Sequence, residues 1–219
     1  MSFQDLTVAA QHYFPDVQVK YKDQSAFMKF LGTVLFFTPD FMTSYTTTIG
    51  STVYFPTNSF VKSRPISSAV VFLHELVHVH DEKTFSKPFF GFLYLFPQIL
   101  ALLCLPLFFF MSWKILIPLM VLFVLPLPAF FRMYFEKRAY ISSLYALNGL
   151  GTRLNFNPTL DSQATFFEAQ FKDSYYYFMW PFGDIKNDFD QALVKIRNNQ
   201  RPFEDAVLFD MLDDLITKV

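Results

Sequence analysis

The chain has 219 residues, of which 53% are hydrophobic and 20% aromatic, including 31 phenylalanines. This hydrophobic share is above that of ordinary soluble domains. A net charge of −1 without a basic tract argues against a nucleic-acid partner. The single cysteine, Cys104, excludes a disulfide framework or a cysteine-based metal site within one chain.

The N-terminal part predicts two short helices, over residues 3–13 and 24–37. Residues 46–56 predict two β-strands around an Ile49-Gly50 turn. An extended peptide can pair with the free edge of such a strand, although a hairpin that only covers the core fits the pattern equally well. The start of the chain lacks the pattern of a signal peptide, so we expect a cytoplasmic N-terminus.

Residues 74–78 read His-Glu-Leu-Val-His, inside an aliphatic run that predicts a helix starting at Pro65. Positions i and i+4 share a helix face, so His74 and His78 can offer two imidazoles to one ion, with Glu75 beside them as a base. The alternative is a helix that carries two histidines by chance. The aliphatic surroundings argue against it, because polar side chains on a buried helix need a partner or a ligand.

A catalytic zinc site needs a third protein ligand and one open position. Residue 84 is threonine, so no third histidine follows at the usual spacing. We expect Glu136 to supply this ligand from a second helix, which the small Ala139 would let approach closely. Glu168 is the competitor, and we interpret it as a solvated acid on a helix surface.

Two polar residues follow His78 on the same predicted helix. Asp81 lies three positions further on and can orient a ligand imidazole. His80 faces another side, which favours a role in the core or in solvent over metal binding.

Residues 88–131 contain a single charge, at Lys114, and predict a membrane hairpin. The two apolar stretches on either side of it, residues 89–111 and 115–131, are about 23 and 17 residues long, against about 20 for a bilayer span. A buried helical hairpin or a re-entrant pair is the alternative. Basic residues gather at the two ends of this region, which puts both ends and the metal site on the cytoplasmic side. They are Lys83, Lys87, Arg132, Lys137 and Arg138.

With these motifs the chain resembles the membrane gluzincins, the HtpX-type proteases and the CAAX prenyl proteases. The resemblance covers roughly residues 64–150. It implies a zinc peptidase with His74, His78 and Glu136 as ligands and Glu75 as the catalytic base. The chain departs from the family at Tyr140, where an aspartate is usual, and it lacks the N-terminal spans of the larger members.

The remaining residues supply candidates for an oxyanion donor. We expect the helix that holds Glu136 to end near Gly149. Arg153 and the tyrosines at 175, 176 and 177 follow it, in a region dense in aromatic side chains that fits a core or interfacial role as well. From Asp184 onwards the pattern predicts two amphipathic helices. The oxyanion candidates are Arg153, Tyr175, Tyr176 and Tyr177.

The sequence therefore predicts one mainly α domain with a small β-sheet over residues 1–219, a gluzincin-like catalytic unit interrupted by the 88–131 hairpin. Its expected activity is zinc-dependent hydrolysis of peptides or membrane proteins at the cytoplasmic face of a bilayer. Two alternatives stay open. One is an inactive or structural zinc-binding membrane protein, and the other is a membrane-anchoring or pore-forming protein with a chance motif.

Overall fold

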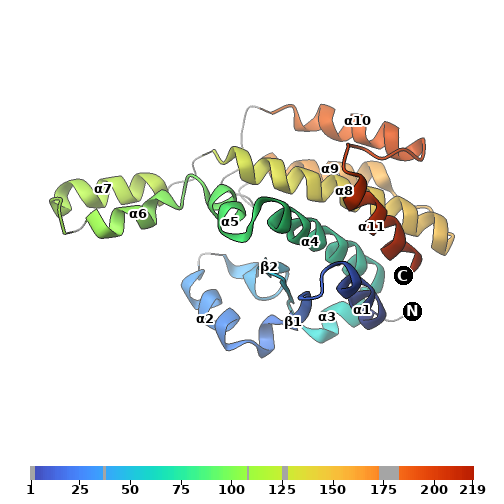
Figure 1. Cartoon of the computed structure of the whole chain (residues 1–219), viewed down its shortest axis with the longest axis horizontal. Coiled ribbons are helices and arrows are strands. Elements are labelled where there is room, and N and C mark those ends of the chain that lie inside the picture. The colour runs from blue at the N-terminus through green and yellow to red at the C-terminus, as the bar shows by residue number, and fades with distance from the viewer. Residues whose placement is uncertain (1–2, 37, 108, 125–127, 173–182) are drawn as a thin grey trace.

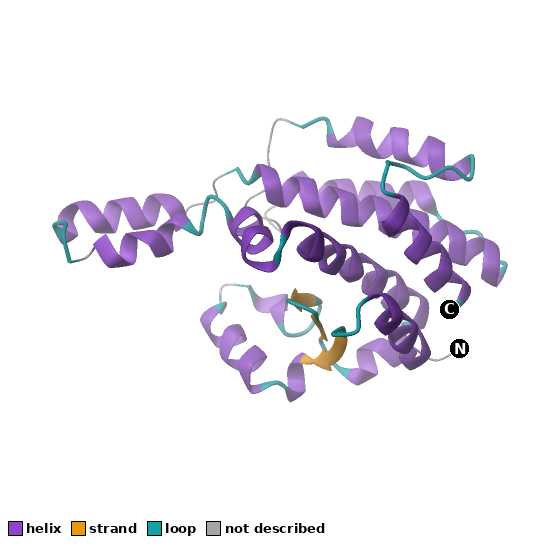
Figure 2. Cartoon of the chain, in the orientation of Figure 1, coloured by secondary structure: helices purple, strands orange, loops and turns teal. Residues whose placement is uncertain are grey.

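The computed structural model describes residues 3–36, 38–107, 109–124, 128–172 and 183–219. These residues form a mainly helical fold with one small sheet, as Figures 1 and 2 show. The α-helices are α1 (Phe3–Tyr13), α2 (Ala26–Val34), α3 (Asn58–Ser63), α4 (Pro65–Phe85), α5 (Lys87–Leu95), α6 (Leu100–Leu107), α7 (Trp113–Val124), α8 (Phe130–Leu154), α9 (Leu160–Lys172), α10 (Ile185–Arg197) and α11 (Ala206–Thr217).

The sheet has three strands in the order β1-β3-β2, namely β1 (Gln18–Tyr21), β2 (Thr47–Ile49) and β3 (Thr52–Phe55). β2 and β3 pair antiparallel, with Thr48 opposite Val53, and Gly50 provides the positive φ of 58° that the tight turn needs. This confirms the expected hairpin. β1 joins β3 in parallel, a pairing between distant segments that the local pattern did not predict.

The long helices α4 and α8 form the centre of the molecule. α4 starts at Pro65, as expected, and lies between the sheet with α1 and α3 on one side and α8 on the other (Figure 1). Most of its apolar side chains are buried, and Phe72 and Leu76 are fully so. Ala139 of α8 is also fully buried, consistent with the close helix approach that its small size permits.

α8 is longer than the sequence predicted, because it passes through Gly149 and ends only at Leu154, where Asn155 takes a left-handed φ of 54°. The glycines serve packing instead of a break. A Cβ at Gly151 would lie 2.5 Å from a side-chain atom of Pro158, and one at Gly149 would lie 3.1 Å from Ile216. The expected pair of C-terminal helices is present as α10 and α11.

The apolar region does not form the expected continuous span over residues 89–111. α5 and α6 meet at a 96° bend, and across the described residues no single helix is both long and apolar enough to cross a membrane, although this bent pair has the length and composition. The reason is local: Pro97 restricts Phe96 to an extended backbone with ψ of 137° and so ends α5. α6 and α7 then pack together as a hairpin that projects from the body (Figure 1).

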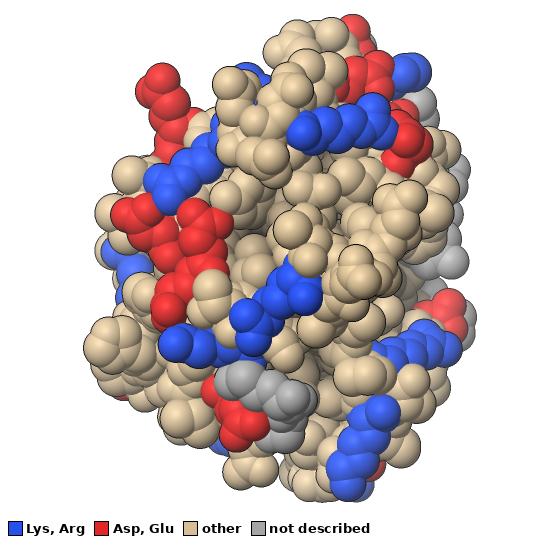
Figure 3. All heavy atoms as spheres, turned by 90° about the vertical axis from the view of Figure 1, so that its right-hand side faces the viewer, with Lys and Arg blue, Asp and Glu red and all other residues tan. Residues whose placement is uncertain are grey.

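The end of the molecule opposite to this hairpin is charged. Figure 3 shows basic and acidic side chains spread over this face among other residues. Ion pairs between exposed groups are found in the C-terminal helices, such as Arg201 with Asp210 at 2.5 Å and Lys186 with Asp190 at 2.6 Å. The two ends of the long axis therefore differ in polarity.

Candidate metal centre

Two histidines of α4 and a glutamate of α8, which is distant from them in the sequence, meet between these two helices. His74 Nε2 lies 3.6 Å from Glu136 Oε2, and His78 Nε2 lies 3.7 Å from Glu136 Oε1. One donor atom from each residue lies within 4.8 Å of the other two. The side chains retain only 11%, 9% and 4% of their accessible surface, so bulk water does little to satisfy their polar atoms.

The local sequence explains this arrangement. The two histidines are one turn apart on α4 and project from the same face, towards α8. Glu136 lies in the second turn of α8, and Ala139 one turn later leaves room for the α4 backbone. Two helices that pack along each other therefore suffice to build the cluster, as the sequence predicted.

His74 is oriented by Ser143, a residue that the sequence analysis did not identify. Ser143 Oγ donates to the carbonyl of Ala139 at 2.9 Å, so it accepts from His74 Nδ1 at 3.1 Å. The Nδ1 proton is thereby fixed, and the Nε2 lone pair faces the cluster. Ser143 thus holds the imidazole in the way that an outer carboxylate often does.

Aromatic rings close the cluster on two sides. Tyr140, which stands where the gluzincin motif usually has aspartate, packs edge-on against the His74 ring at 4.7 Å between centroids. Tyr94 of α5 approaches from the other side, with its ring 6.0 Å from that of His78. Its hydroxyl donates to Glu136 Oε1.

Electrostatics favour a positive charge at this point. Burial raises the pKa of Glu136, but the charge of His78, the interactions of His74 and the hydrogen bond from Tyr94 outweigh it and lower this pKa to about 2. Burial lowers the pKa of His74, yet the hydrogen bond and charge of Glu136 together with the charge of Glu75 raise it overall above 6.5. A carboxylate that stays ionised in such a buried place suits a bound cation.

The donor set fits zinc. Ligands 2.0–2.2 Å from a tetrahedral ion lie about 3.3 Å from one another, close to the 3.6 and 3.7 Å between each histidine Nε2 and the nearer oxygen of Glu136. Glu136 Oε2 and His78 Nδ1 are buried and lack a hydrogen-bond partner among the described residues. Since native proteins rarely leave such atoms unpaired, the free carboxylate oxygen is an argument for a cation in this position. Two imidazoles and one carboxylate leave a fourth position open.

Glu75 lies next to His74 at the wall of a pocket. Its Oε2 accepts a hydrogen bond of 2.7 Å from the hydroxyl of Thr48 on β2, which is an edge strand of the sheet. The pocket has a volume of about 410 Å³. Its lining combines apolar and aromatic groups with a few polar ones: Asp40, Ser44, Tyr45, Thr46, Phe60, Val70, Val71, His74, Glu75, Tyr140, Ser143, Phe166, Phe167 and Gln170.

Asp81 is buried near the cluster, but its hydrogen-bond partner is Arg138 and not the expected imidazole of His78. Its Oδ1 accepts from Arg138 at 3.1 Å, and no hydrogen bond joins it to His78 among the described residues. Arg138 also donates to Asp205 at 2.8 Å, which in turn lies 3.2 Å from His80 Nε2. This network ties α4 to α8 and to the start of α11, and it agrees with a non-ligand role for His80.

The remaining residues that the sequence analysis considered for the site have three different outcomes in the structure. Arg153 is wrong as an oxyanion donor, because 17 residues of helix put it about 25 Å along α8 from Glu136. Glu168 contributes nothing to the cluster, as expected, but it is buried rather than solvated. The tyrosines at 175, 176 and 177 lie outside the described residues.

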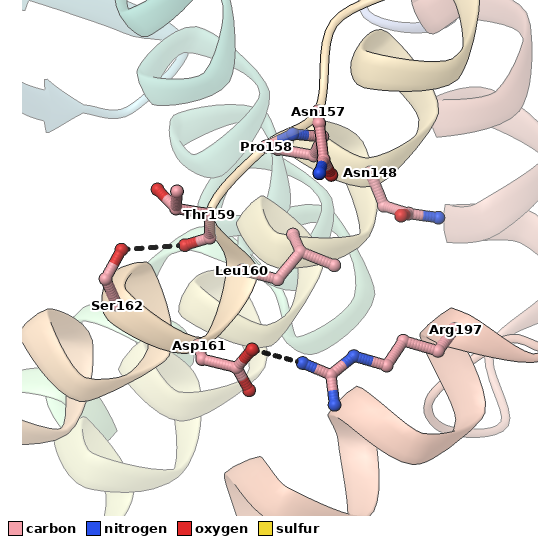
Figure 4. Close-up of a pocket in the computed structure, with 8 residues that line it drawn as sticks. All are labelled: Asn148, Asn157, Pro158, Thr159, Leu160, Asp161, Ser162 and Arg197. Carbon is pink, nitrogen blue, oxygen red and sulfur yellow. Dashed lines mark hydrogen bonds and ion pairs between the residues drawn. The ribbon is translucent and has the colours of Figure 1, made fainter.

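A second pocket, of about 530 Å³, lies at the junction of α8, α9 and α10 (Figure 4). Its lining includes an exposed ion pair of 2.5 Å between Arg197 and Asp161, and it shares no residue with the pocket beside Glu75. Nothing in it resembles a catalytic arrangement.

The chain matches no protein-family model, no curated protein and no solved structure. A function therefore has to be argued from the geometry of the cluster and its surroundings.

Proposed function

We propose that the chain is a zinc-dependent endopeptidase that works at a membrane surface. The observation that carries this proposal is the meeting of His74, His78 and Glu136 beside a pocket whose wall contains Glu75. Three protein ligands with an open fourth position are the arrangement of catalytic zinc, whereas structural zinc sites have four protein ligands.

A zinc ion held by these three side chains would polarise the scissile carbonyl and lower the pKa of a bound water towards neutrality. Glu75 then acts as general base on the attacking water and passes the proton to the departing amine. Thr48 occupies its Oε2, which leaves Oε1 as the oxygen that accepts this proton. Ser143 keeps the Nδ1 proton of His74 directed away from the cluster.

The surroundings of Glu75 fit an extended peptide. β2 is an edge strand, so its outer backbone groups are available to pair with a substrate strand. The pocket offers aromatic and aliphatic walls such as Phe60, Phe166 and Phe167, and no lysine or arginine is among its described lining residues. We therefore expect cleavage next to bulky apolar side chains and poor cleavage next to acidic ones.

The membrane location rests on the α6–α7 hairpin. Many of its apolar side chains are strongly exposed, with Phe109, Phe110 and Trp113 at 85%, 84% and 60%, and Lys114 is its one charged residue. Apolar surface of this extent in contact with water is unfavourable. α7 is about 18 Å long, less than the hydrocarbon thickness of about 30 Å, so we propose that the hairpin enters the bilayer from the side of the metal centre.

The decisive experiment is Glu75→Gln in the full chain, measured with a peptide library and mass spectrometry. We expect turnover to fall by about 100- to 10,000-fold while the zinc content stays near one per chain. Glu82→Gln, the same substitution two turns further along α4, is the matched control and should retain activity. A wild type without zinc, or a Glu75→Gln variant that cleaves normally, would refute the proposal.

The same experiment separates the two alternatives. An inactive structural zinc protein would bind zinc and show no cleavage in the wild type. A membrane-anchoring or pore-forming protein with a chance motif would bind no zinc at all.

A further inference from the structure

We propose that Tyr94 is a positioning residue that holds Glu136 in its ligating orientation, so that the apolar region forms part of the metal centre. This inference rests on the proposed zinc site. Tyr94 lies on α5, the first helix of the apolar region, 42 residues before Glu136 in the sequence. Nothing in the zinc motif itself calls for it.

The first observation is the division of labour between the two oxygens of Glu136. Oε1 accepts a hydrogen bond from the hydroxyl of Tyr94, whereas Oε2 is buried with no hydrogen-bond partner among the described residues. Oε2 lies 3.6 Å from His74 Nε2, and Oε1 lies 3.7 Å from His78 Nε2. The tyrosine thus fixes the rotation of the carboxylate and leaves one oxygen for the metal.

The second observation is that Tyr94 is itself held in place from α8. Arg132 Nε donates to its backbone carbonyl at 3.1 Å, and the guanidinium lies 5.0 Å from the centroid of its ring. The ring of Phe90 lies 5.7 Å from that of Tyr94 and 4.8 Å from that of Phe135. The beginning and the end of the apolar region therefore meet beside the metal ligand.

The third observation is an unfavourable backbone conformation in the turn that brings α5 to this place. Ser86 joins α4 to α5 with φ of 66° and ψ of 144°, a region that residues with a Cβ rarely adopt. Such conformations persist where the surrounding contacts require them, often at functional sites. Here the turn folds α5 back against α8 and places Tyr94 next to Glu136.

Tyr94 is separate from the substrate pocket. The pocket is lined by His74, Glu75 and Tyr140, whereas Tyr94 approaches from the side of His78 and lines no part of it. Tyr94 therefore acts through Glu136 and does not touch substrate. A hydrogen bond to a ligand from outside the metal's own coordination shell typically changes metal affinity by about 10- to 100-fold.

The test compares Tyr94→Phe with Tyr145→Phe in the full chain in detergent. Each variant loses one hydrogen bond from a tyrosine to a carboxylate, and both involve α8, since Tyr145 donates to Asp213 at 2.6 Å. Zinc affinity is measured by competition with a chromophoric chelator, and the cobalt-substituted proteins are compared by visible absorption. We expect Tyr94→Phe to weaken zinc binding by about 10- to 100-fold and to alter the cobalt spectrum, whereas Tyr145→Phe should change neither.

Unchanged affinity and an unchanged cobalt spectrum in Tyr94→Phe would overturn this inference alone. Absence of zinc binding by the wild type would overturn the proposed function and this inference with it. Thermal unfolding without metal checks that the variants fold. If Tyr94→Phe does not fold, Arg132→Gln decides: reduced zinc affinity supports the positioning role, and wild-type affinity refutes it.

Discussion

α4 and α7 are both rich in aliphatic residues, yet their surroundings are opposite. Phe72, Leu76 and Val77 of α4 are fully buried, whereas Ile115, Ile117 and Val121 of α7 retain 57%, 52% and 52% of their surface. The sheet and α8 cover α4, and this cover is what forces its polar residues to find partners in the metal cluster. α6 packs against one side of α7, whereas other apolar side chains of α7 stay exposed across the described residues, and we propose that a bilayer covers them.

The largest expected effect concerns the buried helix α4 and the proposed metal site that its cover creates. Replacing Glu136 with alanine removes one of the three proposed ligands, and a share of about 3–5 kcal/mol of the usual zinc binding energy corresponds to a loss of roughly 1000-fold in affinity. Zinc titration checks this. Glu168→Ala, which removes a buried glutamate outside the cluster, is the control, and equal zinc affinity in both variants would contradict a Glu136 ligand.

The second effect concerns the contact that we propose between the exposed α6–α7 hairpin and lipid. Exchanging Phe109 and Phe110 for aspartate removes two exposed phenyl rings, each contributing about 1.5–3 kcal/mol on transfer out of water. We expect binding to neutral lipid vesicles to fall on the order of 100-fold in a flotation assay. Val207→Asp, at another position that is 70% exposed, should float with the vesicles like the wild type. Vesicle binding that survives the double substitution would show that the hairpin is covered by something other than lipid.

The fold could be predicted from the sequence where a single segment of the chain determines the local structure. The four-residue spacing of His74 and His78 and the aliphatic residues around them were sufficient to predict α4 and two members of the cluster. The expectation of a carboxylate from a second helix led to the third member, Glu136. The bend at Phe96-Pro97 also has a local signal, because the proline predicts a kink, although it does not predict an angle as large as 96°.

Residues that act across long sequence separations were not predictable in the same way. Thr48 and Tyr94 reach the site only because the β2–β3 hairpin and α5 fold against α4 and α8, which no local pattern reveals. Ser143 did leave a signal, since it lies one turn after Ala139 on the face that carries Glu136. The parallel pairing of β1 with β3 depends on the whole N-terminal chain path.

A smaller effect is expected at Thr48, where the sheet contacts Glu75 beside the cluster. Thr48→Val removes the hydroxyl that donates to Glu75, and a hydrogen bond to a charged group is worth about 1.5–3 kcal/mol. We expect kcat to fall by about 10-fold or more, with zinc affinity unchanged. Thr47→Val is the matched control, because neighbouring side chains of a strand point to opposite faces. Equal kcat values for the two variants would exclude a role of Thr48 in orienting the base.

The smallest expected effect concerns the buried ammonium group of Lys22. Lys22 is fully buried, its Nζ donates to the carbonyl of Phe41 at 2.6 Å, and burial lowers its pKa from 10.5 to about 8, although the charge of Glu75 opposes this. Between pH 8 and 10.5 the unfolded chain holds the proton more tightly than the folded chain does, so the free energy of unfolding rises with pH in this window.

We therefore expect a rise of about 1–2 kcal/mol for the wild type between pH 8 and 9.5, and a smaller one for Lys22→Met, measured by urea denaturation. Lys20→Met, which removes an exposed lysine two positions earlier, should behave like the wild type. Identical slopes for the wild type and Lys22→Met would mean that the Lys22 ammonium titrates like a lysine in water.

Asp205 has a consequence for how the candidate metal centre depends on α11. It caps α11 through a hydrogen bond of 3.0 Å from the amide of Leu208, and it is joined to Arg138, which also pairs with Asp81 of α4. α11 packs on α1, α4 and α8, so it joins the helix at the start of the described chain to the two helices that carry the cluster. Local unfolding of α11 would therefore release Arg138 and uncover part of α4, which couples the order of this helix to that of the cluster.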